Sequence, residues 1–314
     1  MSAAAGARSP APAVTAPAAW QVWTGLAIVY VVWGSTYLAI RVMVETIPPL
    51  LGAGVRFTVA GAGLVAVLAL LRGWRAVRPT RRQLAGAGLI GLLLPGANAV
   101  VTLAEVDVPS ALAALLIASV PLILILLRRA TGDRVARASY AGVILGFAGV
   151  ALLLAPGERP DGATLAGMLG CVGAAVMWAT GSFTAPRIEL PSNALVSTGW
   201  QMALGGVVIT AAGVLRGELG DVHADRFSGD SMLAFAYLVV VGSLIAYTAY
   251  AWLLRNVPVS KVGTYAYVNP AIAILLGWLI LDETITGLAL TGAAIIIASV
   301  ALVVRAESAP RRGR

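Results

Sequence analysis

Apolar runs of about 20 residues recur along nearly the whole sequence, and they constrain the fold more than any other feature. Each run is long enough to cross a hydrocarbon core about 30 Å thick as an α-helix. Only 11% of the 314 residues are charged and 59% are hydrophobic, whereas soluble globular domains carry about 25% charged residues. Membrane barrels use ~10-residue segments of alternating polarity instead. The sequence therefore predicts an all-α, polytopic membrane protein.

Ten of these runs are predicted to form transmembrane helices. Because ten is even, both ends of the chain are expected on the same side of the membrane. The runs lie near residues 22–40, 49–71, 83–103, 108–127, 135–155, 164–184, 193–215, 232–254, 260–281 and 286–304.

Basic residues concentrate on one side of this arrangement. With the N-terminus in the cytoplasm, 17 of the 22 Arg and Lys residues fall on the cytoplasmic side, four fall outside, and Arg56 lies within a span. The acidic residues show the reverse, since 11 of the 14 fall outside. Cytoplasmic loops of membrane proteins carry an excess of Arg and Lys. We therefore expect both termini in the cytoplasm, and we attribute the net charge of +8 to orientation and not to nucleic-acid binding.

The two ends of the chain lie outside the apolar runs. Residues 1–19 are rich in Ala, Pro and Ser, which predicts a disordered N-terminal tail. A cleaved signal peptide is the alternative, but the apolar run after Trp20 is too long for one and lacks a small-residue cleavage site. Residues 306–314 form a short basic tail, expected in the cytoplasm.

Metal and disulfide chemistry is limited by the scarcity of ligands. The sequence has one Cys, Cys171, and one His, His223. An intramolecular disulfide is therefore impossible, and a His/Cys metal site cannot be built within one chain. We expect no metal and no cofactor.

Residue spacing indicates a duplicated unit. The first five spans, in residues 20–156, correspond to the last five, in residues 162–305. Because five is odd, the second copy must enter the membrane from the opposite face, which gives two inverted five-helix repeats with a substrate site expected between them near mid-membrane. The matched pairs, 145 to 149 residues apart, are Trp33 and Trp178, Arg56 and Gln201, Pro109 and Pro258, and Pro121 and Pro270.

The sequence resembles the drug/metabolite transporter superfamily, and within it the EamA type, over roughly residues 22–304. The resemblance implies a bacterial inner-membrane carrier with two EamA domains that exports small metabolites, amino acids or drugs and has no ATP-binding machinery. We expect no enzymatic activity. The turn after the fourth span differs from the family, in which a Glu is common where Asp133 stands. The resembling strings are Trp33-Gly-Ser-Thr-Tyr-Leu-Ala-Ile-Arg41, Arg56-Phe57, Gly263-Thr-Tyr-Ala-Tyr-Val-Asn-Pro270 and the acidic turns at Asp133 and Glu283.

Arg56 lies about seven residues inside the second span, roughly 10 Å from its end at ~1.5 Å per residue. A mid-membrane Arg costs about 2.5–3.5 kcal/mol on insertion scales. Our hypothesis is that Arg56 faces a central cavity and attracts an anionic group such as a carboxylate. The alternative is that it extends to the interface or bonds the carbonyls of neighbouring helices. Gln201 at the matching position is uncharged, so the halves would differ chemically.

Asn98, Thr102 and Glu105 are spaced to share one face of the third span. Glu105, near the outer end, is either a solvated loop residue or a cavity residue. In the cavity, burial would raise the pKa of Glu105 and make it the candidate for proton coupling.

Tyr residues with neighbouring polar groups follow in the second half. Tyr247 and Tyr250 share a helical face, as do Tyr265 and Asn269. Such rings suit a cavity that binds amphipathic solutes, although interfacial positions for the tyrosines, and a bond from Asn269 to a neighbouring helix, remain alternatives. The full set of cavity candidates is Trp33, Ser35, Thr36, Tyr37, Arg56, Asn98, Thr102, Gln201, Tyr247, Tyr250, Tyr265 and Asn269.

Two proline and two tryptophan positions match between the halves. Pro121 and Pro270 each remove one helical hydrogen bond and are expected to kink their helices, with freed carbonyls that line the cavity or act at hinges. Trp33 and Trp178 are interpreted as packing residues at helix crossings, with substrate contact as the alternative.

Together these features predict a secondary transporter that works by alternating access. Its expected partners are the lipid bilayer and a small molecule, namely an amino acid, metabolite or drug. A polytopic membrane enzyme would need a cluster of acid/base or metal-binding groups at one face, whereas the longest outer loop, residues 216–231, has scattered charges. A non-transporting protein or channel is the other alternative, but no ring of like charges is visible. Substrate, coupling ion and oligomeric state are left open.

Overall fold

The computed structural model describes residues 17–155, 163–257, 259–283 and 286–308. Within these ranges nine helical stretches are long and apolar enough to cross a membrane, and a tenth, Tyr265–Leu281, is shorter. The first half contains α1 (Ala19–Met43), α2 (Pro49–Arg72), α3 (Trp74–Val77), α4 (Arg81–Ala104), α5 (Ser110–Ile117), α6 (Val120–Ala130) and α7 (Arg137–Leu154). The second half contains α8 (Leu165–Thr184), η1 (Ala185–Arg187), α9 (Ala194–Arg216), η2 (Glu218–Asp221), η3 (Ala224–Arg226), α10 (Gly229–Tyr237), η4 (Leu238–Ile245), α11 (Ala246–Asn256), α12 (Val259–Val262), α13 (Tyr265–Leu281) and α14 (Gly287–Ser308).

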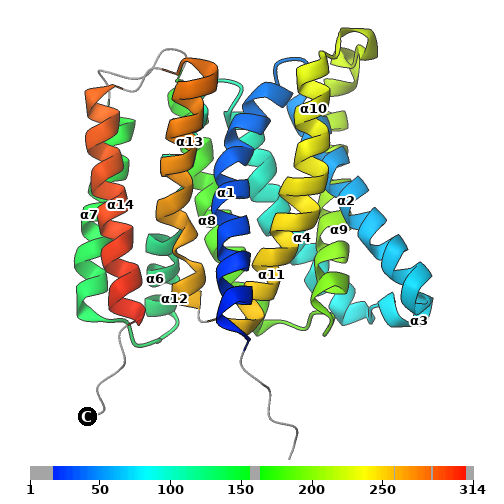
Figure 1. The fold of residues 1–314 in the computed structure, drawn as a ribbon, viewed down its shortest axis with the longest axis horizontal. Coiled ribbons are helices and arrows are strands. Elements are labelled where there is room, and N and C mark those ends of the chain that lie inside the picture. Colours follow the sequence, from blue (N-terminus) through cyan, green and yellow to red (C-terminus); the bar gives the residue numbers. More distant parts are fainter. Residues whose placement is uncertain (1–16, 156–162, 258, 284–285, 309–314) are drawn as a thin grey trace, which may run out of the picture.

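Both ends of the described chain lie at the same face of the bundle (Figure 1). In this view α1 begins and α14 ends at the lower face, where α3 also lies. Five spans precede the connection from α7 to α8, so the second half begins at the opposite face. This arrangement confirms the predicted fold: all-α, with ten transmembrane helices in two inverted five-helix repeats.

Equivalent helices of the two repeats pack in pairs at the two ends of the bundle (Figure 1): α2 packs on α9, and α7 packs on α14. A Cβ added to Gly61 of α2 would lie 2.2 Å from the backbone nitrogen of Ala203 in α9. One added to Gly149 of α7 would lie 3.2 Å from the carbonyl oxygen of Gly292 in α14. Small residues allow such close approach in a membrane, so backbone contact joins the two repeats at both ends.

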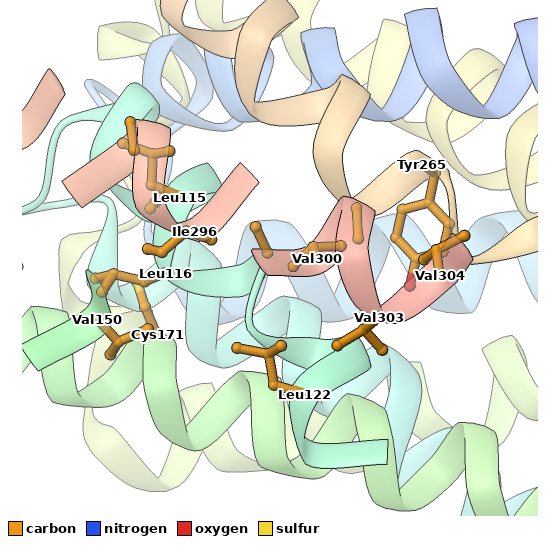
Figure 2. Packing of buried hydrophobic residues seen from close by; sticks show 14 of the residues in the cluster. Leu115, Leu116, Leu122, Val150, Cys171, Tyr265, Ile296, Val300, Val303 and Val304 are labelled. Atoms are coloured by element: carbon orange, nitrogen blue, oxygen red, sulfur yellow. The ribbon is translucent and has the colours of Figure 1, made fainter. Parts of the chain in front are cut away.

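A cluster of buried apolar residues joins the repeats between these pairs (Figure 2). Leu116 of α5 and Leu122 of α6 belong to the same cluster as Ile296 and Val303 of α14. Cys171 of α8 is also a member and is fully buried. The cluster therefore holds α5 and α6, from the first repeat, against helices of the second.

Among the described residues, several spans are not continuous α-helices. The fourth span breaks at residues 118–119, between α5 and α6, and Pro121 occupies the first turn of α6. The ninth span breaks at residues 263–264, between α12 and α13, and α13 then continues through Pro270. The eighth passes through the π-helix η4, between α10 and α11. Discontinuous helices form the binding sites of many transporters, so these interruptions direct attention to the centre of the bundle.

Parts of the predicted tails fall outside the described residues. α1 begins at Ala19 and α14 ends at Ser308. Residues 1–16 and 309–314, on which most of the tail predictions rest, are not described, and Pro258 of the matched proline pairs is not described either.

Candidate functional site

Arg56 lies on α2 with only 2% of its surface exposed. Its Nε donates to the carbonyl oxygen of Leu238 at 3.2 Å and to Oγ of Ser243 at 2.9 Å. Its Nη1 donates to Oδ1 of Asn98 on α4 at 3.2 Å. No carboxylate of the described residues lies within 4.0 Å of the guanidinium. The charge is thus held by neutral acceptors from both repeats.

The partners of Arg56 on the second repeat come from η4. A π-helix is wider than an α-helix and is often found at functional sites. A Cβ added to Gly242 would lie 3.2 Å from Nη2 of Arg56, so a glycine here makes room for the guanidinium. The sequence analysis did not predict this π-helix.

Arg56 lines a cavity between the two repeats. The space open to water-sized groups is about 60 Å³, much smaller than the roughly 300 Å³ or more of a typical ligand pocket, so the described conformation encloses the site tightly. Trp178 also lines it. The sequence-predicted candidates that the structure brings together here are Trp33, Thr36, Tyr37, Arg56, Asn98, Tyr247, Tyr265 and Asn269.

Asn269 has two roles in this geometry. It lines the cavity, and its amide nitrogen, oriented to satisfy both acceptors, lies 3.2 Å from the carbonyl oxygens of Tyr265 and Tyr30. Tyr30 belongs to α1. The bond to a neighbouring helix, given above as an alternative, is therefore compatible with a place in the cavity wall.

Ser35 and Thr102 do not line the cavity. Oγ of Ser35 lies 2.7 Å from the Tyr237 hydroxyl and so links α1 to α10. Oγ1 of Thr102 donates to the carbonyl oxygen of Asn98 within α4 at 2.9 Å. Both hydroxyls satisfy helix contacts instead of facing the solute site.

Gln201 and Tyr250 line pockets nearer the face that carries the chain ends. Nε2 of Gln201 donates to Oγ of Ser197 at 2.9 Å, and its Oε1 accepts from the Tyr247 hydroxyl at 3.3 Å. One pocket of about 480 Å³ contains Gln201, Tyr247 and Tyr250. Another, of about 310 Å³, contains Tyr250 and Tyr265 and is bordered by Arg128 and Glu307 near the ends of α6 and α14.

Four aromatic side chains that pack together line the cavity, one of these two pockets, or both. We call Trp33, Trp178, Tyr250 and Tyr265 the aromatic cluster. The ring centroid of Trp33 lies 4.7 Å from that of Tyr250, 5.3 Å from that of Trp178 and 5.4 Å from that of Tyr265. Trp33 and Trp178 therefore pack at a helix crossing and also line the cavity, so both interpretations of the tryptophans are compatible with the geometry.

The central cavity is less connected to the face opposite the chain ends. A pocket of about 550 Å³ lies there, but it shares no lining residue with the central cavity. At this face Oε1 of Glu283 accepts from the backbone nitrogen of Ser110 at 2.8 Å, and Oε2 accepts from that of Ala111 at 3.2 Å. Glu283 thus joins the end of α13 to the start of α5, across the two repeats.

The acidic turns of the two repeats are equivalent in backbone but not in contacts. Gly132 and Asp282, which precede Asp133 and Glu283, both have left-handed backbones, with φ of 85° and 50°. Asp133 lies at the chain-end face and pairs with Arg128 at 3.5 Å and with Arg187 of η1 at 3.6 Å. Both acidic turns therefore contact the opposite repeat, Asp133 through an ion pair and Glu283 through backbone nitrogens.

Glu105 directly follows α4 and is fully buried, with 0% exposure. Neither carboxyl oxygen has a hydrogen-bond partner. Burial raises the pKa of Glu105 well above its ordinary value, Glu283 raises it further, and the nearby charges of Arg41 and Arg56 oppose the shift. Glu105 is thus not a solvated loop residue, and it also does not belong to the cavity lining.

Comparison with known proteins places this architecture in a family. The model of the EamA-like transporter family matches residues 21–155 and 165–305. The chain belongs to the EamA-like transporter family. It is 40% identical over 276 residues to the uncharacterized inner membrane transporter YedA of Escherichia coli K12, covering 87% of each protein.

Two further relatives are more distant in sequence. The chain is 27% identical over 278 residues to a probable amino-acid metabolite efflux pump of Escherichia coli K12, covering 86% of this chain and 90% of that one. It is 28% identical over 277 residues to protein PecM of Dickeya dadantii, covering 87% and 88%. A solved crystal structure with 22% identity covers 90% of this chain and 96% of its own, with a TM-score of 0.63, and shows a similar fold.

Family membership confirms the predicted membrane transporter. Two EamA matches fit the two five-helix repeats, and two of the relatives are named as a transporter and as a probable efflux pump. A small-molecule substrate and a membrane location follow from the family, and the site between the repeats is where inverted-repeat transporters bind their substrates.

Proposed function

We propose that this EamA-family transporter exports a small amphipathic metabolite with an anionic group, an amino acid being the leading candidate, from the cytoplasm across the bacterial inner membrane. Residues 20–156 and 162–305 act as the two EamA repeats, and both chain ends face the cytoplasm. The excess of basic residues on the chain-end side supports this orientation. The name of the related amino-acid metabolite efflux pump supports the direction and the substrate class.

The proposal that the substrate is anionic depends mainly on the buried charge of Arg56. A buried cation is costly unless a counter-ion compensates it. The described residues place no carboxylate within 4.0 Å, and the three hydrogen bonds engage only Nε and Nη1. A substrate carboxylate would supply the missing charge through strong charge-assisted hydrogen bonds.

The aromatic cluster supports an amphipathic substrate. Its rings present apolar and π surface on the side of the cavity that leads to the chain-end face. Aromatic rings contact apolar and cationic groups favourably. A molecule with a carboxylate at one end and an apolar or ammonium group at the other would therefore match both parts of the site.

Alternating access follows from the asymmetry of the two faces. Two pockets on the chain-end side share Tyr247 and Tyr265 with the cavity, whereas the pocket at the other face shares no lining residue with it. Contacts join the repeats at both faces, from Arg187 to Asp133 on the chain-end side and from Ser110 to Glu283 on the other. Export requires the rings to separate on loading, then the α13–α5 contact to open and release the substrate. Because the repeats are inverted, equivalent helices of the two repeats can exchange conformations, so that one face closes as the other opens.

Proton coupling is assigned to Glu105 within this proposal. A buried carboxyl with no hydrogen-bond partner favours its neutral form, and any change in its surroundings during opening changes its proton affinity. Its neighbourhood includes the charge of Glu283, the residue that joins the repeats at this face. Opening of that contact would therefore alter the protonation of Glu105.

Transport in proteoliposomes tests the proposed substrate recognition. We expect saturable counterflow of at least one anionic or zwitterionic member of an amino-acid panel. Arg56→Ala should abolish it, Arg56→Lys should retain part of it, and the exposed loop variant Arg226→Ala should match the wild type. Unchanged flux in Arg56→Ala, at equal protein insertion, would reject anion recognition by this residue.

A further inference from the structure

Five arginines lie between the last residue of α2 and the first turn of α4, at the chain-end face. All five are exposed, and no acidic residue occurs between Glu45 and Glu105. None of the five takes part in an ion pair within the described part of the chain. The five are Arg72, Arg75, Arg78, Arg81 and Arg82.

The segment between α2 and α4 is packed against neighbouring helices. Val77 of α3 is almost fully buried and packs in a cluster with Val65 and Val196 of the neighbouring helices. The indole nitrogen of Trp200 on α9 donates to the carbonyl oxygen of Val77 at 2.9 Å. The arginines are therefore carried by a segment that is anchored to both α2 and α9, and not by a free loop.

The exposed side next to the arginines is apolar. Leu70 and Leu71 at the end of α2 are 86% and 76% exposed, and Trp74 is 56% exposed. The Trp74 ring lies 6.5 Å from the ring of Trp200. Passing from α2 into α3, the exposed leucines are followed by Arg72, Trp74 and Arg75. Apolar side chains of a span thus lead directly into an aromatic ring and cations, which are the groups found at the lipid interface.

The equivalent connection in the second repeat has a different charge. Residues 216–230, from the last residue of α9 into the first turn of α10, contain two arginines and four acidic residues and lie at the opposite face (Figure 1). Five unpaired cations are thus confined to one repeat and one face. A soluble anion would explain the arginines but not the adjoining exposed leucines.

We propose that residues 70–82 form a binding site for an anionic phospholipid. Arg72, Arg75 and Arg78 hold the phosphate-containing headgroup, and the acyl chains lie along Leu70, Leu71 and Trp74. Polybasic segments at a membrane surface attract anionic lipids, and each Lys or Arg strengthens the binding. This inference is independent of the transported substrate.

Quenching of Trp74 fluorescence by brominated lipids tests the site in nanodiscs that contain the full chain. The Trp74 signal is the difference between the wild type and Trp74→Phe. We expect brominated phosphatidylglycerol, as a minor component in phosphatidylcholine, to quench Trp74 more than brominated phosphatidylcholine does. Arg72→Gln/Arg75→Gln/Arg78→Gln should weaken the phosphatidylglycerol preference, by about fivefold for each arginine lost.

The matched control is Arg216→Gln/Arg226→Gln at the opposite face, which should keep the full preference. Equal quenching by the two lipids in the wild type would overturn the proposal, as would an unchanged preference in the triple variant. Loss of the preference on adding inorganic phosphate at moderate ionic strength would show a phosphate site instead. Loss on adding a soluble acidic polypeptide would assign the surface to a protein partner.

Discussion

Nε of Arg56 donates to Oγ of Ser243 at 2.9 Å, across the interface between the two repeats. Arg56 belongs to α2 of the first repeat and Ser243 to η4 of the second. Any motion that separates the repeats must therefore change the hydrogen bonding of the buried guanidinium. Under the proposed function, substrate binding at Arg56 and the exchange of conformations would be linked through this contact.

Ser243→Ala should weaken substrate binding while leaving the protein folded. A hydrogen bond to a charged group contributes about 1.5–3 kcal/mol, and 1.4 kcal/mol is tenfold in affinity. We expect the KM for transport to rise about tenfold, with little change in the maximal rate. Ser35→Ala, whose hydroxyl contacts Tyr237 outside the cavity, is the control and should leave KM unchanged. A lower maximal rate at unaltered KM would contradict a role in binding.

Glu105→Gln should change how thermal stability depends on pH. Because burial raises the folded-state pKa of Glu105 above its unfolded value, the neutral form contributes stability that is complete below the unfolded pKa. That contribution is lost as pH rises through the folded pKa. The apparent Tm of the wild type should therefore fall more steeply with rising pH than that of Glu105→Gln.

The exposed residue Glu45 provides the control for this comparison. Glu45→Gln should show the wild-type slope of Tm against pH. Glu105→Gln should also flatten the pH dependence of transport if Glu105 carries the coupled proton. Parallel Tm profiles for Glu105→Gln and the wild type would mean that Glu105 does not titrate as a buried group.

Gly61→Ala and Gly63→Ala should have opposite effects on stability although both lie on α2. A Cβ at position 61 would lie 2.2 Å from a backbone nitrogen of α9, whereas nothing lies within 4 Å of one at position 63. Ala is otherwise favoured over Gly in a helix by about 1 kcal/mol. Gly61→Ala should lower the apparent Tm by several degrees, and Gly63→Ala should leave it equal or higher. Equal Tm values for both variants would mean that α2 and α9 are not in backbone contact.

Much of the fold could be predicted because the decisive signals are local. The length of each apolar run follows from the thickness of the bilayer. An isolated Arg56 in such a run also stands out because charge in lipid is costly. The inverted arrangement followed from the odd number of spans per repeat, without knowledge of any contact.

The candidate site was less predictable because helical spacing defines a face and not a position. Thr102 shares a helical face with Asn98, yet its hydroxyl bonds the backbone of its own helix. Gln201 of the second repeat matches Arg56 of the first, but it lines another pocket. Because the second repeat is inverted, Gln201 lies nearer the chain-end face. The π-helix η4 and the burial of Glu105 depend on neighbouring helices, so the sequence left both undecided.

The sides of the membrane on which Asp133 and Asp225 lie provide the strictest test of the architecture. Asp133 lies at the face that carries the chain ends, and the exposed Asp225 lies in the connection at the opposite face. Cys171 is the single native cysteine and is buried, so Cys171→Ser gives a suitable background. Single cysteines introduced as Asp133→Cys and Asp225→Cys can then be labelled with a membrane-impermeant maleimide.

With both chain ends in the cytoplasm, Asp225→Cys should react in intact spheroplasts, and Asp133→Cys should react only after permeabilisation. Reaction of both cysteines from the same side would be incompatible with inverted repeats, because the two positions are separated by an odd number of spans. The reverse pattern, with Asp133→Cys alone accessible, would keep the repeats but reverse the orientation. In that case the two pockets beside the aromatic cluster would open to the outside, and the assignment of the loading face would have to change with them.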